Sequence, residues 1–321
     1  MLNAAKLMKY ISRYILHDNL KKGFNIMTLK NKINVFMTIF MYELEVKLSN
    51  SREKLKKITY QLDEANTDRY LKECIKEIIE KNKNTLVKNT CIKSFRDTEF
   101  SELPIHQINC IKNHISLIKV LLPENINTSV MSKLNHLNKK NTVLPDIVLE
   151  LMIDNNIHYE PIELKSTKTD SIPGSSIQQI NPDEWVIFIK HTKNSLEITT
   201  GRYINSINSK IQFPDRSLRP QVSFKELLNW NINHRQVKDN MFIIKQDNNI
   251  DEKLVLLNDW QNVLCQRWME MLLHSDNIKE NEPWFNNTLR KFMCQFLDEY
   301  NNLTENNKSK LYQTILSQIQ N

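Results

Sequence analysis

The chain has 321 residues and a mass of 38.1 kDa, with a formal net charge of +7 and a sequence pI of about 9.0. Its hydrophobic fraction of 40% is enough for a folded core, and its positive charge favours a polyanionic partner. The only three glycines, Gly23, Gly174 and Gly201, form neither a P-loop nor a G-x-G-x-x-G motif, which excludes nucleotide-driven motors and nicotinamide enzymes.

The cysteines and the apolar runs predict a cytoplasmic protein. The five cysteines are an odd number without a C-x-x-C pair, so we expect neither a disulfide framework nor a zinc site. Cys74, Cys265 and Cys294 fall within helical apolar patterns, which predicts buried thiols. The longest apolar run, residues 33–41, is too short to cross a bilayer. Residues 1–20 form a basic amphipathic stretch that predicts a surface helix rather than a targeting peptide.

The first part of the chain has helical periodicity. Apolar residues recur at spacings of three and four over residues 32–81, which predicts at least two helices, with Asn66 or Thr67 as an N-cap at the break. Residues 101–120 predict another helix, which Pro104 opens and Pro123 ends. Residues 125–141 read as a polar approach to the first strand.

A predicted hairpin follows. Residues 144–153 (LPDIVLELMI) and 158–165 (HYEPIELK) are rich in strand formers and flank the turn-forming run at 154–156. Because side chains two apart share a face of a strand, Glu163 and Lys165 point the same way, and Leu164 points to the other face. Asp146, at the start of the first strand, folds back beside Glu163.

These residue types suit a magnesium site. Mg²⁺ binds one or two carboxylates together with substrate phosphate, so Asp146 and Glu163 are the candidate ligands, and the backbone carbonyl of Leu164 is a possible third. Lys165 can stabilise the charge that develops on a phosphodiester during hydrolysis.

Pro145-Asp146 and Glu163-Leu164-Lys165 resemble the motif of the PD-(D/E)XK nuclease superfamily, and within it the type II restriction endonucleases. The resemblance covers about residues 140–205. It implies an α/β fold with a restriction-endonuclease-like core, in which a central mixed β-sheet is flanked by helices, with helical regions at both ends of the chain. It also implies metal binding by Asp146 and Glu163 and a catalytic role for Lys165. Many members add a glutamate from an upstream helix, for which the candidates are Glu73, Glu77 and Glu80.

The elements after the motif agree with such a sheet. We expect a short helix at 177–180, strands at 185–190 and 196–204, and a basic loop at 205–220 that either contacts phosphates or bases or is simply a solvated loop. The basic residues of this region are Arg202, Lys210, Arg216 and Arg219.

The last part of the chain is predicted to be mostly helical. A helix at 223–230 has Ser223 as its N-cap and Glu226 in a capping box. Residues 241–245 read as an edge strand, and 247–253 as a linker. Helices at 259–274, 284–297 and 309–319 place Trp260, Trp268 and Trp284 in a core, and serve as a dimer interface or a DNA clamp.

The sequence therefore predicts a helical region at 1–100, a nuclease core at 101–245 and a helical region at 246–321. The predicted function is that of a Mg²⁺-dependent type II restriction endonuclease, which cleaves double-stranded DNA at a specific site and leaves 5′-phosphates. A homodimer is expected for a palindromic target, with a cognate methyltransferase encoded nearby. The alternatives are another PD-(D/E)XK nuclease, acting in repair or junction resolution, and a non-catalytic DNA-binding protein.

Overall fold

A computed structural model describes residues 27–58, 69–98, 102–137, 144–172, 181–192, 195–208, 221–274 and 284–319. Its helices are α2 (Leu29–Asn50), α3 (Arg52–Lys56), α4 (Arg69–Asn82), α5 (Ile105–His114), α6 (Thr128–Leu137), α7 (Phe224–His234), α8 (Ile250–His274), α9 (Trp284–Asn301) and α10 (Glu305–Gln318), with 3-10 turns η2 (Pro123–Asn125) and η4 (Tyr203–Ser206). Its strands are β1 (Ser94–Arg96), β2 (Ile115–Leu121), β3 (Ile147–Ile153), β4 (Asn156–Thr167), β5 (Ser171–Ile172), β6 (Trp185–His191), β7 (Leu196–Arg202), β8 (Val222–Ser223), β9 (Arg235–Lys238) and β10 (Met241–Ile244).

A five-stranded mixed sheet in the order β2-β3-β4-β6-β7 is the centre of the fold. Strands β2, β3 and β4 form an antiparallel meander, β6 lies parallel to β4, and β7 returns antiparallel to β6. The predicted hairpin is confirmed. Its two turn residues, Asp154 and Asn155, have φ values of 48° and 65°, the left-handed conformation that a two-residue hairpin requires and that these residue types tolerate.

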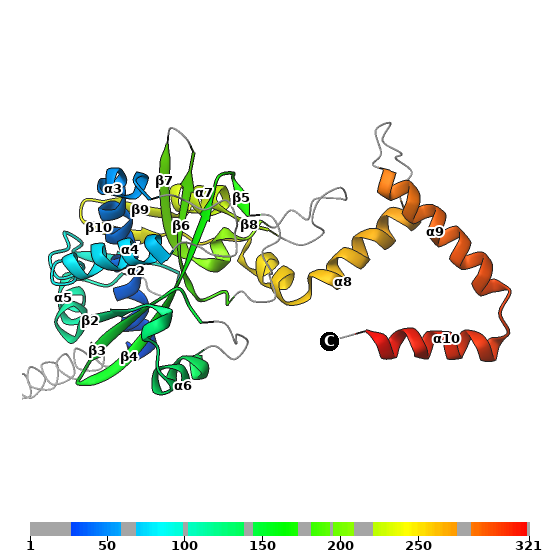
Figure 1. Ribbon diagram of the computed structural model, residues 1–321, viewed down its shortest axis with the longest axis horizontal. Coiled ribbons are helices and arrows are strands. Elements are labelled where there is room, and N and C mark those ends of the chain that lie inside the picture. The colour runs from blue at the N-terminus through cyan, green and yellow to red at the C-terminus, as the bar shows by residue number, and fades with distance from the viewer. Residues whose placement is uncertain are drawn as a thin grey trace, which may run out of the picture. The chain divides into compact units, whose positions relative to one another are not determined.

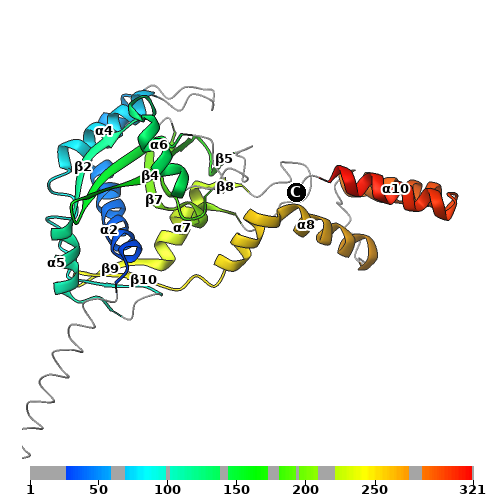
Figure 2. The same cartoon turned by 90° about the horizontal axis from the view of Figure 1, so that it is seen from below.

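Helices cover both faces of this sheet (Figure 1, Figure 2). Buried residues of α2, α4 and α5 share one hydrophobic cluster with Ile162 and Leu164 of β4. On the opposite face, Tyr159 of β4 packs in a second cluster with α6, and Phe188 of β6 meets Phe224 of α7 edge to face at 5.6 Å. The mixed α/β architecture with helices flanking a mixed sheet is therefore confirmed.

The predicted helix at 101–120 is half wrong, because only its first part is helical. Residues 115–121 form β2, which pairs antiparallel with β3. A register shift between Leu117 and Lys119 leaves Ile118 and Lys119 both exposed, so the alternation of a strand is interrupted and the apolar spacing imitates a helix. Pairing with β3 decides the conformation.

Three further expectations need correction. The stretch at 125–141, expected to be a polar approach, contains α6. Strand β10 is the middle strand of a second sheet, β1-β10-β9, and not an edge strand. The supposed linker at 247–253 contains the start of α8, and Lys253 is buried beside Asp247, with 3.5 Å between Nζ and Oδ2. The ion pair explains how these polar residues are accommodated.

Several predictions for side chains are tested as well. Cys74 is buried as expected, but Cys265 and Cys294 are exposed. Trp260 and Trp268 are partly exposed rather than core residues, and the side chain of Trp284 lies outside the described residues. Two more expectations lie outside the described residues, namely the N-cap candidates Asn66 and Thr67 and the short helix at 177–180. Ser223 caps α7 as predicted, because its Oγ accepts a hydrogen bond from the amide of Glu226 at 3.2 Å.

By its internal contacts the chain forms two compact units. Within the described residues, one unit contains the central sheet together with α2, α4 and α5, which share its hydrophobic core. The other contains, of the described residues, 258–274 and 284–319. Helix α8 changes direction at Asp259, whose φ of −147° and ψ of 33° are not helical. In the described part of the chain, no helix is both long and apolar enough to span a membrane.

Candidate functional site

The structure brings Asp146 and Glu163 together at the start of β3. In the β3–β4 register Ile147 pairs with Ile162, so Asp146, one residue earlier, lies opposite Glu163. The Asp146 Oδ2 accepts a hydrogen bond from the Leu164 amide at 2.9 Å, which holds this carboxylate against β4. The predicted convergence of the two acidic residues is therefore present.

Pro145 explains why the Leu164 amide donates its hydrogen bond to a side chain and not to the backbone of the preceding strand. The register continues to a pairing of residue 145 with Leu164, but proline has no N–H and cannot donate to the Leu164 carbonyl. The ladder ends, and Asp146 accepts the Leu164 N–H instead. The N–H and C=O of one strand residue point to the same side. The Leu164 carbonyl therefore points, like the Leu164 N–H, to the side of the strand where Asp146 lies.

Each carboxylate is paired with a lysine. The Lys165 Nζ lies 2.7 Å from Glu163 Oε1, as the shared strand face predicts, and both side chains are about three-quarters buried, with 26% and 23% of their surface exposed. The second lysine, Lys72 of α4, was not anticipated. Its Nζ lies 2.5 Å from Asp146 Oδ1.

Burial and charge set the protonation of this cluster. Burial raises the pKa of the Glu163 carboxyl, and so does the negative charge of Asp146, whereas Lys165 opposes the rise. For Lys165, burial lowers the pKa, but its interactions with Tyr203 and Glu163 outweigh burial and the net pKa is raised. Lys165 is thus a charged ammonium at neutral pH.

Two further residues with ionisable side chains lie beside Lys165 and Glu163. Burial, and then the charge of Glu163, raise the pKa of Glu184 to about 8, and only 7% of this residue is exposed. Burial also raises the pKa of Tyr203, against the opposing charge of Lys165. Glu184 stands two residues before Val186, the parallel partner of Glu163, so both carboxyl groups share one face of the sheet. Only the parallel register could have revealed this.

The three upstream glutamates have partners elsewhere. Glu73 pairs with Arg69 at 2.8 Å and Glu77 with Lys54 at 2.5 Å. Glu80 accepts a hydrogen bond from the Val120 amide at 2.8 Å and pairs with Lys83 at 2.9 Å. At the candidate site, α4 supplies the ammonium of Lys72, and not one of these carboxylates.

The donor set fits a hard divalent cation that is completed by a substrate. Asp146 and Glu163 offer carboxylate oxygens and Leu164 a carbonyl oxygen, which are the ligand types that Mg²⁺ takes, with its remaining positions left to water and phosphate. Among the described residues, no three or more His, Cys, Asp or Glu side chains group as a metal cage. The carboxylates and the carbonyl therefore fit Mg²⁺ by the type of their donor atoms.

Of the four basic residues singled out around the predicted loop, only Arg202 is described. Its guanidinium lies 3.8 Å from the centre of the Trp185 ring and donates to Asn34 Oδ1 at 2.7 Å. Lys210, Arg216 and Arg219 lie outside the described residues. Comparison of the chain with known protein families, with curated proteins and with solved structures gave no match.

Proposed function

We propose that this chain is a Mg²⁺-dependent endodeoxyribonuclease of the PD-(D/E)XK type, acting as a type II restriction endonuclease. The observation that carries the proposal is the hydrogen bond from the Leu164 amide to Asp146, which fixes one carboxylate opposite Glu163 with the Lys165 ammonium on the same face. Two carboxylates that can hold a divalent cation, with an ammonium beside them, are groups that suit metal-assisted phosphodiester hydrolysis.

The topology supports the same proposal. The motif residues lie on an antiparallel pair, and the next central strand, β6, runs parallel to the strand that carries Glu163 and Lys165. A sheet of this composition with helices on both faces is what the resemblance implies. The net charge of +7 favours attraction to DNA.

The roles of the residues follow from their positions. Asp146 and Glu163, with the Leu164 carbonyl, would hold Mg²⁺, which when bound supplies positive charge against the charge that builds on the phosphate. Lys165, kept charged by its surroundings, is placed to neutralise a non-bridging phosphate oxygen as water attacks phosphorus. The bond from phosphorus to the 3′ oxygen breaks, so the products carry a 5′-phosphate and a 3′-hydroxyl.

Lys72 has to change partner in this scheme. Its ammonium occupies Asp146 Oδ1 and would compete with a divalent cation for the same carboxylate. A cation bound to Asp146 would displace the Lys72 ammonium from this carboxylate. Lys72 would then be a second cation beside the site, contributed by the upstream helix from which the resemblance implies a glutamate.

A digest of fully sequenced, unmethylated phage DNA tests the proposal. Discrete fragments that require Mg²⁺, and whose ends ligate without prior phosphorylation, support a restriction endonuclease. Cleavage confined to branched or damaged DNA favours the repair or junction-resolving alternative. DNA binding without cleavage in Mg²⁺ or Mn²⁺ favours the non-catalytic alternative. Analytical ultracentrifugation of the same sample tests the expected homodimer.

A further inference from the structure

Tyr203 is buried beside the candidate site, and the roles proposed above do not include it. It is the first residue of the turn η4, directly after β7, and only 3% of it is exposed. The β6–β7 register places Tyr203 opposite Glu184. Glu184 shares a face of the sheet with Glu163 and Lys165. Tyr203 therefore carries its hydroxyl on the same face as the candidate site.

The backbone of Tyr203 is held at both of its polar groups. The Tyr203 amide donates a hydrogen bond to the Glu184 carbonyl at 2.8 Å. The Tyr203 carbonyl accepts one from the Ser206 Oγ at 2.7 Å, and Ser206 is fully buried. These two bonds fix the starting point of the Tyr203 side chain relative to β6.

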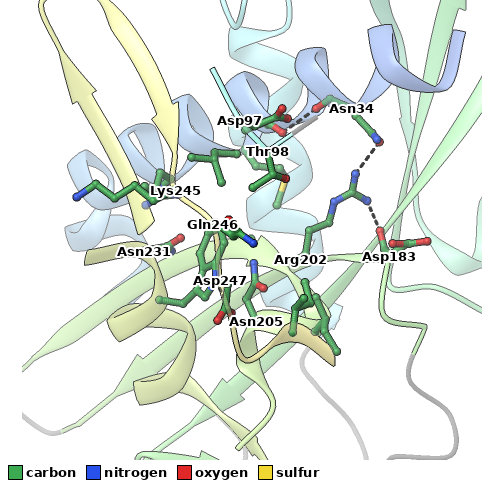
Figure 3. Close-up of a pocket in the computed structure, with 18 of the residues that line it drawn as sticks. Asn34, Asp97, Thr98, Asp183, Arg202, Asn205, Asn231, Lys245, Gln246 and Asp247 are labelled. Carbon is green, nitrogen blue, oxygen red and sulfur yellow. Dashed lines mark hydrogen bonds between the residues drawn. The ribbon is translucent and has the colours of Figure 1, made fainter. Parts of the chain in front are cut away.

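Arg202, the residue before Tyr203, anchors the end of β7 from the opposite face. There it lines a cavity of about 500 Å³, and its guanidinium donates to Asn34 Oδ1 at 2.7 Å and to the Asp183 carbonyl (Figure 3). Asp183 directly precedes Glu184, whose carbonyl accepts from the Tyr203 amide. The segment before β6 and the end of β7 are thus joined on both faces of the sheet, which leaves Tyr203 little freedom to move.

The Tyr203 hydroxyl reaches the Lys165 ammonium. The Lys165 Nζ lies 2.7 Å from Glu163 Oε1, and Lys165 also forms a hydrogen bond with Tyr203. An ammonium has three N–H donors and no acceptor, so the phenol oxygen accepts this bond. With one donor on Glu163 and a second on Tyr203, the direction of the third N–H is fixed.

A second partner matters because a lysine side chain is flexible. Its ammonium stands at the end of a four-carbon stem, and a single hydrogen bond leaves it free to turn about that bond. A group that acts on a reacting phosphate has to be held in place by neighbours that are themselves rigid. Tyr203, with its backbone fixed by Glu184 and Ser206, is such a neighbour.

We propose that Tyr203 is a positioning residue, which holds the Lys165 ammonium by a second hydrogen bond and directs the remaining N–H toward the phosphate that is cleaved. The inference rests on the proposed function for the identity of the substrate, whereas the contact between Tyr203 and Lys165 can be measured without DNA. The competing explanation is a purely structural tyrosine, whose ring fills space where η4 packs against α7.

The first arm follows the Lys165 ammonium by NMR in the full chain, prepared with isotope-labelled lysine, in EDTA and without DNA. Lys165→Met identifies the signal by its absence. Tyr203→Phe keeps the ring and removes only the hydroxyl, so the Lys165 signal should shift and weaken as its hydrogens exchange faster with water. The control Tyr159→Phe changes another buried tyrosine of β4 and should leave the signal as it is. An unchanged Lys165 signal in Tyr203→Phe overturns the inference.

A reciprocal measurement serves if circular dichroism shows that Tyr203→Phe does not fold. The chain is then labelled at the tyrosine ring carbon that bears the hydroxyl, and Lys165→Met is compared with the unmutated chain. The Tyr203 signal should shift in Lys165→Met and the Tyr159 signal should not. A Tyr203 signal that stays in place overturns the inference equally.

The second arm measures DNA cleavage under steady-state conditions. Tyr203→Phe should lower kcat at least about tenfold and leave KM and salt-dependent DNA binding unchanged, because a misdirected ammonium is missed mainly in the transition state. Tyr159→Phe should cleave normally. A lower kcat together with an altered Lys165 signal supports the positioning role, and an altered signal with an unchanged kcat overturns it.

The two arms separate this inference from the proposed function. If the unmutated chain cleaves DNA but Tyr203→Phe changes neither the Lys165 signal nor kcat, the proposed function stands and Tyr203 is structural. If the unmutated chain cleaves no DNA, the proposed function fails, and the first arm alone decides whether Tyr203 holds Lys165.

Discussion

Glu184 offers a quantitative test of the electrostatics of the candidate site. This carboxyl group is buried beside Glu163, and its pKa of about 8 lies roughly 3.5 units above its ordinary value of 4.5. We consider Glu184→Gln, which keeps the shape of the side chain and makes it permanently neutral. The measurement is the free energy of unfolding in urea, with EDTA present so that no divalent cation changes the balance.

The sign follows from proton binding. Below pH 4.5 the carboxyl group is protonated in both the folded and the unfolded chain, so burial carries no ionisation penalty. Between pH 4.5 and 8 the unfolded chain has released this proton and the folded chain retains it, so stability falls as pH rises. At about 1.4 kcal/mol per pKa unit, the loss reaches about 3 kcal/mol at pH 7 and about 5 kcal/mol above pH 8.

The glutamine variant does not suffer this loss. Relative to the unmutated chain, its free energy of unfolding should therefore be larger at pH 9 than at pH 5 by about 4 kcal/mol, which means a more stable variant at pH 9. Asp170→Asn is a control of opposite sign, because the hydrogen bond from Lys190 lowers the pKa of the exposed Asp170, and its removal should give no gain at pH 9. A difference between Glu184→Gln and the unmutated chain that does not change with pH would refute the reasoning.

Three other changes test separate parts of the structure. Lys72→Ala removes the ammonium that pairs with Asp146 and should tighten Mn²⁺ binding about tenfold in a calorimetric titration. The control Lys76→Ala, one turn along α4, should not change this affinity. Equal Mn²⁺ affinities of Lys72→Ala and the unmutated chain would contradict competition between Lys72 and the cation. Ser223→Ala removes the N-cap of α7 and should lower the free energy of unfolding by about 1 kcal/mol, with Ser223→Thr largely unaffected. Asn155→Val should lower the free energy of unfolding by about 1 kcal/mol, because a β-branched residue disfavours the positive φ of this position, and Asn155→Gly should be nearly neutral. If urea unfolding shows the glycine variant to be the less stable of the two, the turn geometry is contradicted.

The hairpin and its site residues were predictable because their signals are local. Alternation over residues 158–165 fixes the shared face of Glu163 and Lys165, and the turn at Asp154 and Asn155 fixes the register that brings Asp146 opposite Glu163. Ser223 was found for the same reason, since a cap lies within one turn of the amide it binds.

What the sequence did not reveal depends on tertiary pairing. Strand β2 looked helical because a register shift interrupts its alternation. Lys72 reaches Asp146 from a helix 74 positions earlier in the chain, a contact that no local pattern encodes. Glu184 and Tyr203 join the site only through the parallel pairing of β4 with β6 and the turn after β7. The polar residues Asp247 and Lys253 suggest a linker in the sequence, but they form a buried ion pair at the start of α8.

Comparison of Lys165→Ala with the unmutated chain tests whether the Asp146, Glu163 and Lys165 cluster hydrolyses DNA. Both are incubated with sequenced phage DNA and Mg²⁺, cleavage rates are measured on gels, and DNA binding is measured in EDTA. The exposed Lys168, just past the end of β4, provides the matched control Lys168→Ala. We expect Lys165→Ala to cleave at least about 100-fold more slowly while its salt-dependent DNA binding remains, and Lys168→Ala to cleave normally. Cleavage by Lys165→Ala at the unmutated rate would contradict this role of the cluster.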